Sequence, residues 1–319
     1  MARLVLHIGT PKTGSTAIQR YARAHQPYLA SRGIDFLLRG RLASYNDLAI
    51  SLRGGKHDAA ATIATDIRKR MEESDAGTFV LSSEMFTGVD PARLRDALAL
   101  TAMPETRIIG YFRRQDRYLE SSYKQKMKTG KVAPGFQNYV DKFGIRGGDY
   151  RRIVDAWQAA WPEATFIFRR FDPVGLVRGD VVHDFTALLG LDIDTDGKPP
   201  PAEPANPTPS IDLLDLMQIV ARIPGVDARK VFRALPVADL PRFRGRAMEN
   251  TAARALLAQF ADGNAALCQR FFPGDNALFA TDDLDGPEPE IATPSFTDDQ
   301  RRIITALLRA VAENSSGAS

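Results

Sequence analysis

The sequence has few of the residues that form covalent or metal cross-links. It contains one cysteine, Cys268, so no disulfide can form within the chain. Its four histidines and that cysteine do not stand at the spacing of zinc ligands, so we predict no structural zinc. No apolar run approaches the roughly 18–20 residues that a membrane-spanning helix needs. These absences exclude a disulfide scaffold and predict a protein without a membrane span.

The sequence also lacks a strong charge of either sign. Its 319 residues carry 42 Lys and Arg against 39 Asp and Glu, which gives a net charge of +3 and a pI near 9.0. This excess is too small to indicate a nucleic-acid partner, but it suits an acidic small molecule in a local basic pocket. The residues before Gly9 are too few for a signal-peptide core, so we expect a cytoplasmic protein.

Short β-branched or aromatic runs alternate with amphipathic segments over the first two thirds of the chain. The expected strands are Leu4–Ile8, Thr78–Leu81, Arg107–Phe112 and Thr165–Phe168. The expected helices are Ser15 to about Ser31, Ala59–Met71, Pro91–Leu100, Asp116–Met127 and Tyr150–Trp161. This alternation predicts an α/β fold with a central, mostly parallel sheet flanked by helices. Ligands of such sheets bind beyond the carboxyl ends of the strands.

A proline-rich segment divides this region from the rest of the chain. Six prolines fall between positions 199 and 209, where they prevent a regular helix or ladder. We therefore expect a core domain at 1–198, a linker at 199–209 and a helical C-terminal region at 210–319. In that last region Ser210 is expected to cap a helix, and Thr297 and Gln300 have the spacing of a capping box.

The strongest motif is the run Gly9–Thr16, Gly-Thr-Pro-Lys-Thr-Gly-Ser-Thr. It follows an expected strand and opens an expected helix, which is the context that a phosphate-binding loop requires. Its glycines let successive N–H groups point at one anion, and the helix dipole with the hydroxyls of Ser15 and Thr16 adds to the attraction. In nucleotide triphosphatases a lysine follows the second glycine, whereas here Lys12 lies inside the loop. A simple turn with a solvated lysine is the alternative.

With the preceding His7 and Ile8, this run resembles the 5′-phosphosulfate-binding loop of sulfotransferases that use 3′-phosphoadenosine 5′-phosphosulfate (PAPS). It is most similar to bacterial members, whose loop reads His-Ile-Gly-x-x-Lys-[Thr/Ala]-Gly-[Thr/Ser]-[Thr/Ser], and every position is met. The resemblance covers about the first 190 residues. It implies a three-layer, P-loop-like fold, no obligatory metal and a catalytic role for Lys12. The loop residues that it assigns to PAPS are Pro11, Lys12, Thr13, Gly14, Ser15 and Thr16.

The resemblance also implies a second anion site, for the 3′-phosphate of PAPS. The family uses an arginine at a strand end and a serine eight residues later, and Arg113 and Ser121 have this spacing. A guanidinium offers a planar, permanently charged fork to phosphate oxygens. The family sometimes adds a late basic segment, which would correspond to the cluster Arg242, Arg244 and Arg246. We expect a solvated loop for that cluster.

Glu84 is the candidate general base. It follows the expected strand Thr78–Leu81 in the run Ser-Ser-Glu, which is similar to bacterial members at this point. A carboxylate there could accept the proton that a hydroxyl loses on sulfonate transfer. A helix cap or a structural salt bridge is the alternative role for this side chain.

Together these residues predict a PAPS-dependent sulfotransferase that acts on a hydroxyl or amine of a small-molecule or glycan acceptor. Two other classes stay open, an ATP-dependent small-molecule kinase with an altered loop and a non-catalytic nucleotide-binding protein. A kinase would need a lysine after Gly14, where Ser15 stands. Nothing in the sequence identifies the acceptor or the oligomeric state.

Overall fold

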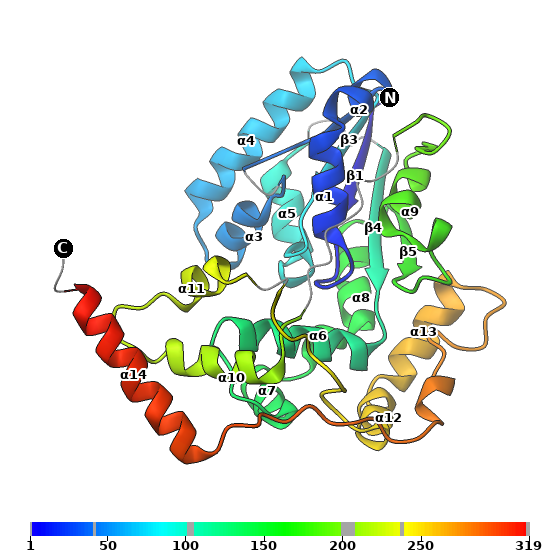
Figure 1. Ribbon diagram of the computed structural model, residues 1–319. Coiled ribbons are helices and arrows are strands. Elements are labelled where there is room, and N and C mark those ends of the chain that lie inside the picture. Colours follow the sequence, from blue (N-terminus) through cyan, green and yellow to red (C-terminus); the bar gives the residue numbers. More distant parts are fainter. Residues whose placement is uncertain (1, 41–42, 101–104, 199–207, 237–238, 317–319) are drawn as a thin grey trace. The chain divides into compact units, whose positions relative to one another are not determined.

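The computed structural model describes residues 2–40, 43–100, 105–198, 208–236 and 239–316, which group into two compact units (Figure 1). The first unit comprises 1–114, 149–203 and 262–279, and the second comprises 115–148, 204–261 and 280–319. Most of the proline-rich linker, residues 199–207, lies outside the described residues. The domain boundaries expected from the sequence stay a prediction.

A parallel sheet forms the centre of the first unit. Its strands are β1 (Arg3–His7), β2 (Ile34–Phe36), β3 (Thr78–Ser82), β4 (Glu105–Phe112) and β5 (Thr165–Arg170). They are ordered β2-β3-β1-β4-β5, and every adjacent pair is parallel. The α/β fold predicted from the sequence is therefore confirmed. The short strand β2 was not predicted.

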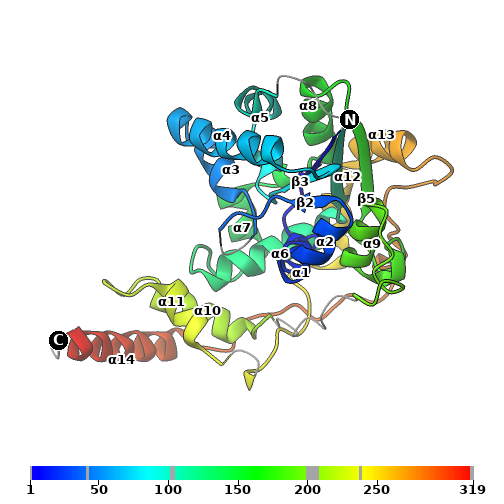
Figure 2. The same ribbon diagram turned by 90° about the horizontal axis from the view of Figure 1, so that it is seen from above.

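Alternating side chains of the strands build two apolar layers, one on each face of the sheet. Leu4 and Leu6 of β1 face one layer and Val5 faces the other. Helices cover both faces, as Figure 2 shows, which gives the three-layer architecture. The first face carries α3 (Asn46–Arg53), α4 (His57–Glu73), α5 (Pro91–Leu98) and α8 (Tyr150–Ala160), and the second carries α1 (Ser15–Ala24), α2 (Gln26–Ser31) and α9 (Val181–Leu188).

The helix expected from Ser15 to about Ser31 is two helices. Helix α1 ends at Ala24, and α2 begins at Gln26 with Pro27 in its first turn. Proline has no N–H to donate and its ring clashes with the carbonyl four residues back, so it belongs at the start of a helix. The prediction of one helix across this proline was wrong.

The second unit is helical. Two apolar clusters, one with Tyr123, Met127 and Leu214 and one with Met217 and Val220, join its helices, which Figure 1 shows. These helices are α6 (Gln115–Lys128), α7 (Phe136–Phe143), α10 (Ile211–Val220), α11 (Ala228–Ala234), α12 (Asn250–Ala258) and α14 (Asp298–Ser316), while α13 (Ala261–Phe271) lies almost wholly in the first unit. Within the described residues, no helix is both long and apolar enough to cross a membrane.

Both expected helix caps of this unit are confirmed. The Ser210 hydroxyl accepts a hydrogen bond from the Leu213 N–H at 3.3 Å. Thr297 and Gln300 form the reciprocal pair of a capping box: the Thr297 N–H donates to Gln300 Oε1 at 2.9 Å, and the Gln300 N–H donates to Thr297 Oγ1 at 3.2 Å.

Arg246 is not part of a solvated loop, although Arg242 and Arg244 beside it are exposed. Its guanidinium lies 2.8 Å from Glu120 and 3.4 Å from Asp116, two buried carboxylates of α6. Arg246 therefore neutralises charge inside the second unit, because buried carboxylates require a paired cation. The expectation of solvent exposure was wrong for this arginine.

Candidate functional site

The loop Gly9–Ser15 leaves the sheet at its centre, since β1 lies between β3 and β4. Three residues of this loop have positive φ: Gly9 at 44°, Lys12 at 72° and Gly14 at 78°. Repeated left-handed residues curl a backbone into a concave turn whose N–H groups point inward. The loop therefore has the shape that an anion cradle needs.

Both glycines allow close approaches that a side chain would prevent. A Cβ on Gly14 would lie 2.6 Å from Val181 of α9, and a Cβ on Gly9 would lie 2.7 Å from Ser15 Oγ and 3.1 Å from Glu84 Cα. These separations are shorter than ordinary van der Waals contacts. The loop is thus packed between the start of α9 and the chain that follows β3.

Two threonines hold the loop in shape from within. The Thr13 hydroxyl donates to the Thr10 carbonyl at 2.6 Å, and the Thr10 hydroxyl donates to the carbonyl of Tyr111 in β4. Both side chains are fully buried. They fix the loop before any ligand arrives, which lowers the ordering cost of binding.

The N-terminus of α1 is open at this loop. Gly14 is its N-cap and provides no side-chain cap, and the first turn contains no acidic residue. The first N–H groups of a helix have no intrahelical partner and carry the positive end of its dipole. Ser15 is 3 % exposed, and its Oγ has no hydrogen-bond partner within the described residues. A buried hydroxyl without a partner is costly, so its place at this helix end fits a bound anion.

Replacing Ser15 with alanine is expected to stabilise the free protein and to weaken anion binding. Removing a buried hydroxyl that lacks a partner recovers its desolvation cost, about 1 kcal/mol in the free energy of unfolding. The measurement is urea unfolding of both proteins, with and without adenosine 3′,5′-bisphosphate. The nucleotide should stabilise Ser15→Ala less than the unchanged protein.

Ser83→Ala is the matched control, because Ser83 is equally buried but its hydroxyl donates to Asn46 at 2.6 Å and accepts from the Met85 N–H. It should lower the free energy of unfolding by about 1 kcal/mol. Should Ser15→Ala destabilise the free protein as Ser83→Ala does, the Ser15 hydroxyl is satisfied without a ligand and the assignment fails.

Lys12 holds a strained position at the turn of the loop. A non-glycine residue in the left-handed region costs about 1–2 kcal/mol, so the lysine side chain must bring an advantage that glycine would not. The Lys12 carbonyl accepts a hydrogen bond from Arg113 Nη1 at 3.1 Å. The first unit thus places Lys12 and Arg113, two of the predicted site residues, together in one place.

Arg113 follows β4 directly and is held from two further sides. Its guanidinium carbon lies 5.7 Å from the ring centre of Phe171, and its carbonyl accepts a hydrogen bond from the Tyr150 hydroxyl at 2.6 Å. A guanidinium is planar and permanently charged, which suits the oxygens of a phosphate group. Ser121 lies on α6 in the second unit. Its pairing with Arg113 in one site stays a prediction.

Glu84 lies two residues beyond β3, next to Gly9 of the loop. It is half-buried, and its carboxylate forms no hydrogen bond or ion pair with any residue that the structure describes. The following short helix η1 (Phe86–Gly88) has Met85 at its N-cap and no side-chain cap. Neither alternative role, a helix cap or a structural salt bridge, is therefore observed.

A buried polar network beneath the loop was not predicted as a unit. The Ser82 hydroxyl lies 2.9 Å from His7 Nδ1 and accepts a hydrogen bond from Gln19 at 3.0 Å. Burial lowers the pKa of His7 to about 4, so the ring is neutral at pH 7 and adds no charge to the site. The network ties the ends of β1 and β3 to α1. It fixes where Glu84 leaves the sheet, because the Ser83 N–H also donates to the His7 carbonyl at 3.1 Å.

Comparison with known proteins does not assign an activity to this chain. No protein-family model matches the chain. A curated protein of Archaeoglobus fulgidus, described as an uncharacterized protein, is 33% identical to this chain over 114 residues. The matched part is 36% of this chain and 30% of the relative, so the chain spans less than a third of that relative's length.

Proposed function

We propose that this protein is a sulfotransferase that moves a sulfonate group from PAPS to a hydroxyl or amine acceptor. The observation that carries the proposal is the cradle at the start of α1, where an uncapped helix and the unpartnered, buried hydroxyl of Ser15 meet a loop that contains Lys12. This set of donors fits the 5′-phosphosulfate group of PAPS. The sequence resemblance assigns the same residues to that group.

In this proposal the backbone of Thr13–Thr16 binds the 5′-phosphate, and Arg113 with Ser121 binds the 3′-phosphate. PAPS supplies a sulfonate activated by its mixed anhydride with phosphate. The acceptor oxygen or nitrogen forms a bond to sulfur while the bond from sulfur to the bridging oxygen breaks. Glu84 takes the proton of the acceptor. Lys12 stabilises the negative charge that develops on the departing phosphate.

The kinase alternative has less support. A P-loop kinase uses a lysine directly after the second glycine and an acidic residue that holds Mg²⁺ at a strand end. Here Ser15 takes the place of that lysine, and β3 ends in Ser82. The lysine of this chain instead lies inside the loop, at the turn that Arg113 supports.

Thermal unfolding with three nucleotides tests the proposal. Adenosine 3′,5′-bisphosphate, the other product of the transfer, should raise the melting temperature without metal, by the equivalent of about 2.7 kcal/mol at 100 times its Kd. Adenosine 5′-monophosphate should stabilise less, because it lacks the 3′-phosphate. ATP with Mg²⁺ should not stabilise.

Arg113→Met serves as the control for the second anion site. It should reduce the effect of the bisphosphate to that of the monophosphate, while the remaining shift reports that the loop is intact. Stabilisation by ATP with Mg²⁺ alone would favour a kinase. If none of the three nucleotides changes the melting temperature, the protein has no nucleotide site and the proposal is wrong.

A further inference from the structure

A pocket of about 890 Å³ in the second unit has no part in the proposed reaction. It is lined by α10, by the first half of α14, by the chain around Pro134 and by the segment Ile291–Pro294. Its volume lies in the range of sites for small molecules, about 300–1,000 Å³.

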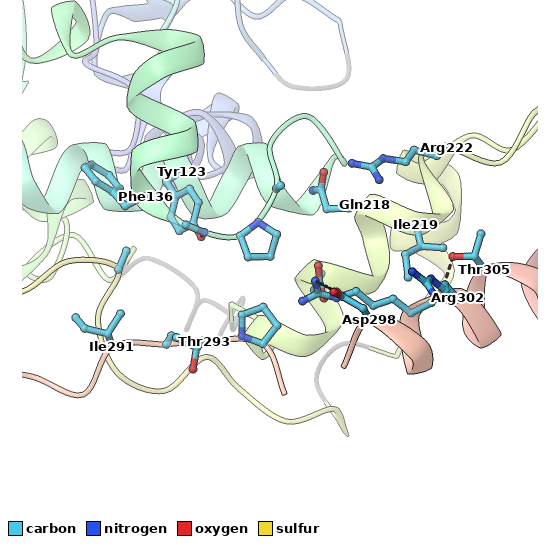
Figure 3. A pocket seen from close by; sticks show the side chains of 18 of the residues that line it. Tyr123, Phe136, Gln218, Ile219, Arg222, Ile291, Thr293, Asp298, Arg302 and Thr305 are labelled. Carbon is cyan, nitrogen blue, oxygen red and sulfur yellow. Dashed lines mark hydrogen bonds and ion pairs between the residues drawn. The ribbon is translucent and has the colours of Figure 1, made fainter. Parts of the chain in front are cut away.

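The pocket has an apolar end and a cationic end. Figure 3 shows Tyr123 and Phe136 together on one side, with Arg222, Arg302 and Thr305 on the other. Tyr123 is fixed in place, because its hydroxyl accepts a hydrogen bond from the Gly135 N–H at 2.8 Å. An aromatic wall suits the face of an apolar ring, so the lining fits a ligand with unlike ends.

Positive charge exceeds negative charge in this lining. It contains four arginines and two aspartates. Both aspartates share one arginine, since Arg301 lies 3.0 Å from Asp215 and 3.6 Å from Asp298. The pocket thus keeps an excess of two positive charges.

The other three arginines of the lining are not neutralised by a buried carboxylate. Arg302 pairs with Asp299 at 3.4 Å, where both side chains are more than four-fifths exposed and the interaction is screened. Arg222 and Arg309 have no carboxylate within ion-pair distance in the described part of the chain. Guanidinium groups bind carboxylate, sulfate and phosphate through paired hydrogen bonds, so these side chains can hold an anionic group.

We propose that this pocket is a second ligand site, for a small amphipathic anion that has an apolar ring at one end and an acidic group at the other. Phe136 contacts the ring, and the almost fully buried Tyr123 packs against Phe136 with 5.8 Å between the ring centres. Arg222 and Arg309 bind the acidic group. The site shares no residue with the loop at the start of α1, because every residue of its lining belongs to the second unit.

Titration calorimetry of the full chain tests this site with 2-naphthalenesulfonate as the probe. The sulfonate should bind at least about tenfold more tightly than 2-naphthalenemethanol, which lacks charge, and than inorganic sulfate, which lacks the ring. Parallel titrations with 2-naphthoate and 2-naphthyl phosphate identify which acidic group the arginines prefer. Equal affinity for the sulfonate and the neutral alcohol would overturn the proposal.

Two double variants, one inside the pocket and one outside it, test whether the sulfonate binds in this pocket. The double variant Arg222→Gln/Arg309→Gln should weaken sulfonate binding about tenfold, and since both side chains are exposed its melting temperature should not change. The double variant Arg229→Gln/Arg233→Gln removes two exposed arginines of α11 outside the pocket and should bind normally. A saturating concentration of adenosine 3′,5′-bisphosphate should not displace the probe. An equal loss in the α11 variant, or displacement by the bisphosphate, would place the probe elsewhere and overturn the proposal.

Discussion

Lys12→Ala should lower the rate of sulfonate transfer by about 10²–10³, the usual cost of removing one preorganised charge stabiliser. The reason is the position of Lys12 inside the loop, where its ammonium group can meet charge that develops only as the sulfonate leaves. The measurement is transfer from radiolabelled PAPS to an acceptor found by screening hydroxyl and amine compounds. If the screen gives no acceptor, the hydrolysis of PAPS, in which water accepts the sulfonate, is measured instead.

Lys12→Ala should change the binding of adenosine 3′,5′-bisphosphate much less than it changes the rate of sulfonate transfer. The 5′-phosphate is assigned to backbone N–H groups, so Lys12→Ala should retain most of the thermal stabilisation by adenosine 3′,5′-bisphosphate. Lys56→Ala, which removes an exposed lysine at the start of α4, should leave both rate and binding unchanged. If Lys12→Ala turns over at the normal rate, the lysine has no role in transfer and the reaction assigned to the loop is wrong.

The strained backbone of Lys12 allows a second comparison, between Lys12→Gly and Lys12→Ala. Glycine adopts a φ of 72° without cost, so Lys12→Gly should raise the stability of the free protein by about 1 kcal/mol relative to Lys12→Ala. Both variants lack the ammonium group and should be equally slow. Compared with the unchanged protein, Lys12→Gly would then be more stable but slower, as expected where a strained residue serves function.

Most of the sheet and the loop could be predicted from local patterns. Strands such as β1 and β4 are β-branched or aromatic runs, and the order of glycines and lysine after β1 marks the loop within eight residues. Elements without such a pattern were missed. β2 is a strand of three residues, and α3 lies between two of the expected elements. Both take their structure from packing against the rest of the first unit.

Details of the loop, and of the packing inside the second unit, depend on contacts between distant parts of the chain. Ser82 is 75 residues from His7, yet the pair fixes how β1 and β3 end side by side. Arg246 meets carboxylates 126 and 130 residues away, which no local pattern around it indicates. The missing partner of Ser15 is also a property of its surroundings, so only the folded chain reveals it.

Glu84→Gln is expected to lower the rate of transfer by about 10²–10⁴, the range for loss of a general base. Glutamine keeps the size and hydrogen-bonding ability of the side chain but cannot accept the acceptor proton. Stability should not fall, because the Glu84 carboxylate has no partner among the described residues to lose. Nor should the affinity for adenosine 3′,5′-bisphosphate change, since that ligand does not include the acceptor.

A conservative variant separates a base from a merely structural carboxylate. Glu84→Asp keeps a carboxylate at this position and should recover part of the rate that Glu84→Gln loses. Glu72→Gln, at an exposed position of α4, is the matched control and should keep the full rate. A Glu84→Gln variant that keeps more than half of the rate would show that another group takes the proton. The register of β1 and β3 argues against that result, because it places Glu84 directly beside the loop that holds Lys12.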